Sequence, residues 1–190
     1  MFLPTKPSPA RVRELIAAQI NLPFSYPEVG ATRTTPPQGY TVDHNRVQLG
    51  FGKECFERAV NAIRSWKQFD LSWVEAVPAD IPIELGAAVG VLARHFGFWS
   101  LNVSRIVYLI DESGPIEKFG FAYGTLTSHI EQGEERFTVR WHRDDDSVWY
   151  DILAFSRPNQ YLIKFSRPVA RMLQRRFAND SLNAMVKAVK

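Results

Sequence analysis

Between residues 72 and 155 the chain carries six segments with the composition of β-strands, and the links between them are of hairpin length. Strands joined by such short links pair antiparallel, because a parallel pair needs a crossover of about a dozen residues or more. An antiparallel sheet must cover at least one face with apolar groups from another element. We therefore expect one antiparallel sheet closed by a helix. The expected strands span residues 72–77, 87–94, 105–111, 119–126, 136–141 and 147–155.

The segments on either side of this block complete the pattern. A further strand is expected over residues 40–49, and a helix over residues 50–66, where apolar residues recur every three or four positions. Ser8 followed by Pro9 indicates the start of a short helix over residues 10–19. After the last expected strand the apolar spacing becomes helical again, which predicts a long C-terminal helix. Its apolar stripe consists of Leu162, Phe165, Val169, Leu173 and Phe177.

This order of elements predicts an α+β fold, a curved antiparallel sheet of about seven strands packed on a long C-terminal helix. Pro168 lies inside the stripe of that helix, as either the first turn of a second helix or a kink. The arrangement is similar to the helix-grip fold of the START and Bet v 1 superfamily, in which the sheet wraps the last helix around a cavity. Residues 1–39 contain seven of the twelve prolines and are expected to form an N-terminal extension with a short helix. Residues 40–190 are expected to form a single α+β domain.

The alternation of apolar and polar side chains specifies the register of the last hairpin, but it does not decide which face of the strand over 119–126 points inward. With the last hairpin loop centred near Asp144 and Asp145, the facing residues on one side are all apolar or aromatic, and a one-residue slip would mix them with polar ones. Those pairs are Trp141 with Val148, Val139 with Tyr150, and Phe137 with Ile152. In the strand over 119–126, aromatic residues alternate with small ones, and either set could face inward. Small residues inside would leave room for a ligand or a close helix.

The formal charge of +3 conceals an asymmetry. Residues 156–190 carry eight Lys and Arg against one Asp, which is 8 − 1 = +7, so residues 1–155 carry 3 − 7 = −4. A basic helix over 159–190 could bind a protein or an anionic surface, although a solvated outer face explains the same charges. Nucleic acid is not expected as a partner, because the positive charges lack interleaved aromatic residues.

Several classes of protein are excluded. Cys55 is the only cysteine, so no disulfide can form within the chain, and no apolar run approaches the ~20 residues of a membrane helix. No Gly-x-Ser-x-Gly motif occurs, and the four histidines are too scattered to indicate a metal site. We therefore expect a soluble, cytoplasmic protein without a transmembrane segment, cofactor or metal.

A series of short motifs runs from about residue 24 to residue 187. They include GFAYGTL at 120–126 with His129, GEERF at 133–137, VWY at 148–150, AFSRP at 154–158 and QRRF at 174–177. On these motifs the chain resembles an uncharacterised family, the domain of unknown function nineteen-ninety. Residues 127–130 depart from the family, which is richer there in proline and glycine. The resemblance implies a single-domain protein without a known activity, so no catalytic residue carries over.

The aromatic content of 13%, the expected fold and the missing catalytic motif favour a binding module over an enzyme. Its expected partner is a small hydrophobic or amphipathic ligand held between the sheet and the C-terminal helix. An alternative is a hydrolase or cyclase on the same scaffold, in which His129 acts with Glu134 or Glu135. A third is an adaptor that uses the basic helix. The candidate ligand-binding residues are Arg105, Phe121, Tyr123, His129, Glu134, Glu135 and Tyr150.

Overall fold

The computed structural model of the chain describes residues 1–129, 131–158 and 167–190. Its strands are β1 (Phe2–Leu3), β2 (Thr41–Phe51), β3 (Val74–Val77), β4 (Ala88–Arg94), β5 (Trp99–Glu112), β6 (Ile116–Thr125), β7 (Glu131–His142) and β8 (Ser147–Pro158). Its helices are α1 (Pro9–Ala17), α2 (Gly52–Arg64) and α3 (Arg167–Ala188), with short 3-10 turns η1 (Ala31–Arg33) and η2 (Lys67–Phe69).

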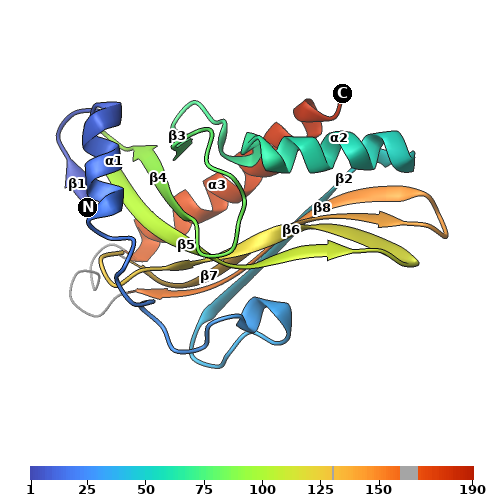
Figure 1. Cartoon of the computed structure of the whole chain (residues 1–190), viewed down its shortest axis with the longest axis horizontal. Coiled ribbons are helices and arrows are strands. Elements are labelled where there is room, and N and C mark those ends of the chain that lie inside the picture. The colour runs from blue at the N-terminus through green and yellow to red at the C-terminus, as the bar shows by residue number, and fades with distance from the viewer. Residues whose placement is uncertain (130, 159–166) are drawn as a thin grey trace.

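The strands form one antiparallel sheet in the order β2-β8-β7-β6-β5-β4-β3, and β1 pairs with β5 beside this path. The sheet curls, with α2 and α3 along one side of β6–β8 and the segment between α1 and β2 on the other (Figure 1). We call the side toward α2 and α3 the concave face and the other side the convex face. The structure thus confirms the predicted α+β class and the sheet of seven strands packed on a C-terminal helix.

The predicted register of the last hairpin is confirmed. Strands β7 and β8 pair Trp141 with Val148 and Phe137 with Ile152, as the apolar alternation requires. The expected strand over 136–141 begins too late, because β7 begins at Glu131 and pairs there with Pro158. The polar residues there belong to a strand end. Glu131 meets Gln174 on α3, and Gln132 accepts from Arg157 on β8, partners that are distant in the sequence.

The open orientation of β6 is also settled. Its aromatic side chains Phe121 and Tyr123 belong to the concave core, and the small residues between them face the convex side. Gly124 lies directly under the ring of Tyr26, and a Cβ built at Gly124 would overlap the Tyr26 hydroxyl oxygen. Small residues on β6 therefore make room for the N-terminal segment, whose Phe24 bridges to Leu126.

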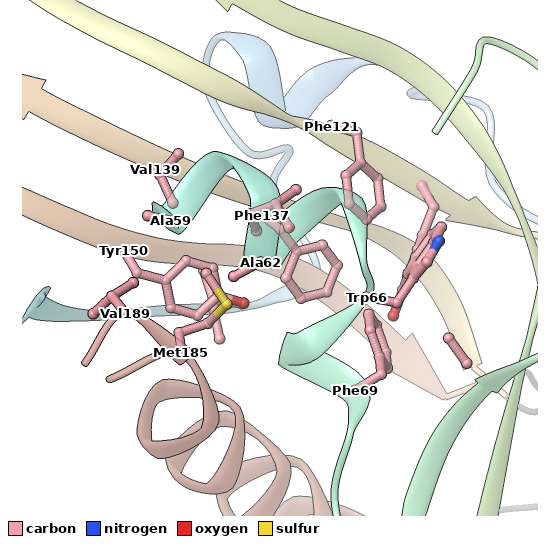
Figure 2. Packing of buried hydrophobic residues seen from close by; sticks show 14 of the residues in the cluster. Ala59, Ala62, Trp66, Phe69, Phe121, Phe137, Val139, Tyr150, Met185 and Val189 are labelled. Atoms are coloured by element: carbon pink, nitrogen blue, oxygen red, sulfur yellow. The ribbon is translucent and has the colours of Figure 1, made fainter. Parts of the chain in front are cut away.

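Two apolar cores lie on the two faces. The concave core joins α2, η2 and α3 to the sheet, and in Figure 2 Trp66, Phe69, Phe121 and Phe137 gather on one side of it. The convex core joins α1 to β4 and β5; its buried members include Val12, Leu15, Ile16, Leu92 and Leu101. Residues 1–39 are therefore packed against the sheet.

The two halves of α3 are buried to different extents. Its second half is fixed in the concave core by Met185 and, just past the end of the helix, by Val189, which are 0% and 3% exposed. Its first half exposes Val169 and Met172, while Leu173 packs against the core. The predicted stripe residues Leu162 and Phe165 lie outside the described residues. None of the helices in the described ranges is long and apolar enough to cross a membrane.

Candidate functional site

A cavity of about 790 Å³ lies between the concave face of the sheet and the first half of α3. Strands β4 to β8 and β2 contribute to its wall, and η2 closes one side with Phe69. Most of the lining surface is apolar. The apolar side chains include Phe69, Trp73, Val91, Ile152, Leu173 and Phe177.

Four polar side chains connect α3 to the sheet at this cavity, and we call them the polar bridge: Asp43, Glu131, Arg171 and Gln174. Arg171 donates to both oxygens of Asp43, with 2.7 Å between Nη2 and Oδ1, and its hydrogen bonds lower the pKa of that carboxyl. Gln174 Nε2 lies 2.8 Å from each oxygen of Glu131. Burial raises the pKa of Glu131, and the Gln174 hydrogen bond opposes this. The bridge holds the exposed half of α3 through polar contacts.

Glu135 is the carboxyl group at the centre of the concave wall. The Tyr123 hydroxyl donates to its Oε2 at 2.8 Å. Burial among apolar groups raises the pKa of Glu135 to about 7, with smaller contributions from the charges of Glu131 and Asp43, while the Tyr123 hydrogen bond acts in the opposite direction. Glu135 can therefore hold or release a proton close to neutral pH, which suits it to ligand binding or to acid–base chemistry.

The raised pKa of Glu135 predicts a pH-dependent stability. The folded protein keeps this proton up to about pH 7, whereas the unfolded chain releases it near pH 4.5, so stability falls as pH rises between these values. We expect a loss of about 1–2 kcal/mol, since each pKa unit is worth ~1.4 kcal/mol and cavity water reduces the effect. Urea unfolding at pH 5 and pH 8, for wild type and E135Q, measures it.

In that experiment the Glu135→Gln variant separates the contribution of Glu135 to the pH dependence of stability from the contributions of the other titratable groups. We expect the variant to lose less stability than wild type between the two pH values, and identical profiles would contradict the assignment. The titratable and charged groups that share the cavity or act on Glu135 are Asp43, His95, Tyr123, His129, Glu131, Glu134, Tyr150, Arg171 and Arg175.

His129 also lines the cavity, in the turn before β7. Burial lowers the pKa of this imidazole to about 4, and the positive N-terminus adds to the effect. The backbone N–H of Glu131 donates to its Nδ1 at 3.0 Å, a bond that needs this nitrogen unprotonated. His129 is therefore neutral at physiological pH.

Only some of the residues singled out from the sequence come together here. Tyr123, His129 and Glu135 line the cavity. Phe121 and Tyr150 are fully buried in the filled part of the concave core, where Tyr150 lies beside Met185 (Figure 2). The Tyr150 hydroxyl is 3.1 Å from Oγ of Ser181 on α3, so it contributes to the attachment of that helix.

Glu134 borders the cavity, whereas Arg105 is not among its lining residues, and both residues turn their polar groups to the convex side. Glu134 is 2% exposed and accepts hydrogen bonds from the Tyr26 hydroxyl at 2.8 Å, from the backbone N–H of Gly30 at 2.6 Å and from both donors of Thr32. Arg105 donates to the carbonyl of Ile20 and stacks over Phe24. Both residues hold the N-terminal segment on the sheet.

The enzyme alternative pairs His129 with Glu134 or Glu135, and only the Glu135 carboxyl lies on the concave side with the cavity. Adjacent residues of a strand point to opposite faces. Within residues 1–129, 131–158 and 167–190, no group of three or more His, Cys, Asp or Glu is placed to hold a metal ion.

Sequence reasoning missed the polar bridge and Asn102. The signal for Asp43 was present, because it alternates with Asn45 on the inner face of β2, where an apolar residue would be usual. Arg171 and Gln174 lie on one face of a helix, but nothing in their spacing indicates partners more than forty residues away.

Comparison with known proteins identifies the family. A model described as "Domain of unknown function (DUF1990)" matches residues 25–184. A UPF0548 protein of Dictyostelium discoideum is 40% identical over 208 residues, covering 100% of this chain and 96% of the relative. A UPF0548 protein of Deinococcus radiodurans is 35% identical over 201 residues, covering 99% and 98%.

Among solved structures, the fold is similar to that of the Zhui aromatase/cyclase of Streptomyces sp. R1128. The TM-score is 0.53 at 13% identity, and the match covers 79% of this chain and 93% of that one. At this identity the likeness concerns the fold alone, a curved antiparallel sheet packed on a C-terminal helix. The family match and its relatives agree with the motifs found in the sequence, and the chain belongs to the DUF1990 family, with UPF0548 proteins as its relatives.

Proposed function

We propose that this protein binds a small apolar or amphipathic molecule in the cavity between the sheet and α3. The observation that carries the proposal is the cavity itself. Its volume of about 790 Å³ falls in the range of about 300–1,000 Å³ typical of ligand sites. Its lining is mainly apolar and contains a few polar groups, among them Tyr123, Glu135 and Asn102. Such a lining buries an apolar body and orients one polar end.

Native mass spectrometry of the purified protein tests this proposal directly. We expect a bound molecule that dissociates on denaturation, or, for protein stripped by mild unfolding and refolding, a raised melting temperature with lipids, isoprenoids or aromatic compounds. A stripped protein that binds none of these classes would contradict the proposal.

Filling the cavity provides a matched test. Ala154 lines the cavity on β8, and we expect Ala154→Phe to weaken binding at least about tenfold, because the ring occupies the space of the ligand. Ala17→Phe, on the exposed side of α1, adds the same ring outside the cavity and should leave affinity within about twofold. Isothermal titration with any ligand found by mass spectrometry measures both. Equal affinities in the two variants would place binding elsewhere.

One observation favours a second candidate, an enzyme on the same scaffold. Glu135, with a pKa raised to about 7 by burial, lies in the cavity beside Tyr123, and a carboxyl group of this kind suits a general acid near neutral pH. Incubation with a bound ligand distinguishes the two. Recovery of the unchanged molecule supports the binding function, whereas conversion that is lost in E135Q supports the enzyme.

The adaptor alternative is less favoured by the contacts of α3. Arg171 is paired with Asp43, and Arg176 lies 3.5 Å from Asp180 in an ion pair along the same helix. These pairs neutralise part of the positive charge expected on the basic helix.

A further inference from the structure

Most polar groups around the cavity already have partners within the protein. In the polar bridge, Arg171 occupies both oxygens of Asp43, and Gln174 approaches both oxygens of Glu131. Thr125 exchanges hydrogen bonds with the backbone of Gly133. These groups have little capacity left to recognise a ligand.

Glu135 differs from these groups because only one of its oxygens is used. Oε2 accepts from the Tyr123 hydroxyl, and no donor among the described residues reaches Oε1. The carboxyl is set among apolar lining residues such as Phe69 and Ile152. A carboxylate in such surroundings gains a large interaction energy from any donor brought to its free oxygen, because water is scarce there.

A second acceptor lies on the wall formed by β5. Oδ1 of Asn102 is buried, and it has no hydrogen-bond partner within the described part of the chain. Its Nδ2 already donates to Ser100 Oγ, at 3.4 Å. Within the described residues, Glu135 Oε1 and Asn102 Oδ1 are thus acceptors without a donor on two walls, and acceptors recognise donors.

The charges around the cavity point the same way. Four acidic residues line it; Arg171 neutralises Asp43, and Glu134 turns its carboxylate to the convex side, which leaves Glu131 and Glu135. Arg175 also borders the cavity, but its side chain is exposed on α3 and its charge acts on Asp43, whose pKa it helps to lower. An anionic ligand end placed next to Glu135 would meet a like charge in a poorly hydrated space.

We propose that the ligand presents a hydrogen-bond donor, either a protonated amine or a hydroxyl, to the free oxygen of Glu135, with its apolar body along the wall of Phe69, Leu173 and Phe177. This inference rests on the proposed function and narrows its ligand to donor-bearing amphiphiles. It excludes fatty acids and other amphiphiles with an acidic end.

Three probes of equal chain length test it: decylamine, decanol and decanoate, each below its aggregation concentration, titrated at pH 8 into stripped full-length protein. Calorimetry or competition with a fluorescent apolar probe gives the three affinities. We expect decylamine to bind at least about tenfold more tightly than decanoate, with decanol between them, since a charge-assisted hydrogen bond is about twice as strong as a neutral one.

The variant E135Q then assigns the effect to one side chain. Gln keeps an acceptor for a hydroxyl but loses the charge, so we expect the amine-to-carboxylate preference to fall about tenfold while decanol binding stays within about twofold. Glu84→Gln removes an exposed charge outside the cavity and controls for net charge. It should leave all three affinities unchanged.

The outcomes separate this inference from the function on which it rests. If decanol binds but decylamine and decanoate bind equally, or if E135Q keeps the wild-type preference, the inference is overturned and the binding function stands. If none of the three binds and the protein also takes up no other apolar compound, both are overturned.

Discussion

Replacing Glu134 by alanine is expected to lower the free energy of unfolding by about 3–5 kcal/mol, because it leaves several buried donors without an acceptor. Those donors are the Tyr26 hydroxyl, the backbone N–H groups of Gly30 and Thr32, and the Thr32 hydroxyl. Glu134 is 2% exposed, so water cannot replace the lost carboxylate without opening the N-terminal segment. Denaturant unfolding monitored by tryptophan fluorescence measures the change.

Glu112 supplies the matched control for this substitution. It is a glutamate on β5, paired with Lys118 at 2.7 Å, and its side chain is 57% exposed. We expect Glu112→Ala to cost less than about 1 kcal/mol, because exposed ion pairs contribute little. If the two variants lose similar free energy of unfolding, the contribution of Glu134 to stability does not depend on its burial.

A comparable loss is expected from Gly124→Ala, about 2–3 kcal/mol. The added methyl group would lie 2.9 Å from Cζ of Tyr26 and overlap its hydroxyl oxygen, so the ring that reaches Glu134 would have to move. The same methyl group added to a protein that already carries Tyr26→Ala has nothing to displace, and we expect it to cost less than about 1 kcal/mol there.

Thermal and urea unfolding of the two single variants and the double variant give the coupling between these positions. The expected result is a strongly non-additive cycle, in which the double variant is little worse than Tyr26→Ala alone. If the losses of unfolding free energy are additive, Gly124 is required by the conformation of β6 and not by contact with Tyr26.

These two positions also show how far the sequence could predict the structure. The alternation of Phe137, Val139 and Trp141 determined the register of β7 and β8 correctly. Continued by one further step, the same alternation places Glu135 inside and Glu134 outside. The expected strand begins only at residue 136, so the pattern leaves the two glutamates as equivalent candidates.

Other parts of the site depend on contacts between distant segments. Asp43 is a polar residue at an inner position of a strand. Such a residue indicates a cavity only when it is known that the element packed opposite, here α3, leaves space in front of it. Arg171 lies 128 positions away along the chain, and which of several arginines meets Asp43 depends on where α3 crosses the sheet. The volume of the cavity likewise follows from how closely that helix packs, which periodicity does not encode.

The two halves of α3 are attached differently, and this affects how binding in the cavity is related to the stability of the fold. Its second half is bound through Met185 and Val189, whose removal from the core would expose apolar surface to water at high cost. Its first half is bound through Leu173 and Phe177, which pack against the core, and through Arg171 and Gln174, whose polar contacts water can replace. A guest molecule entering under the first half competes with hydration and leaves the second half in place. An occupant of the proposed kind would therefore add to the stability of the folded state without being required for it, and it would exchange while the protein remains folded.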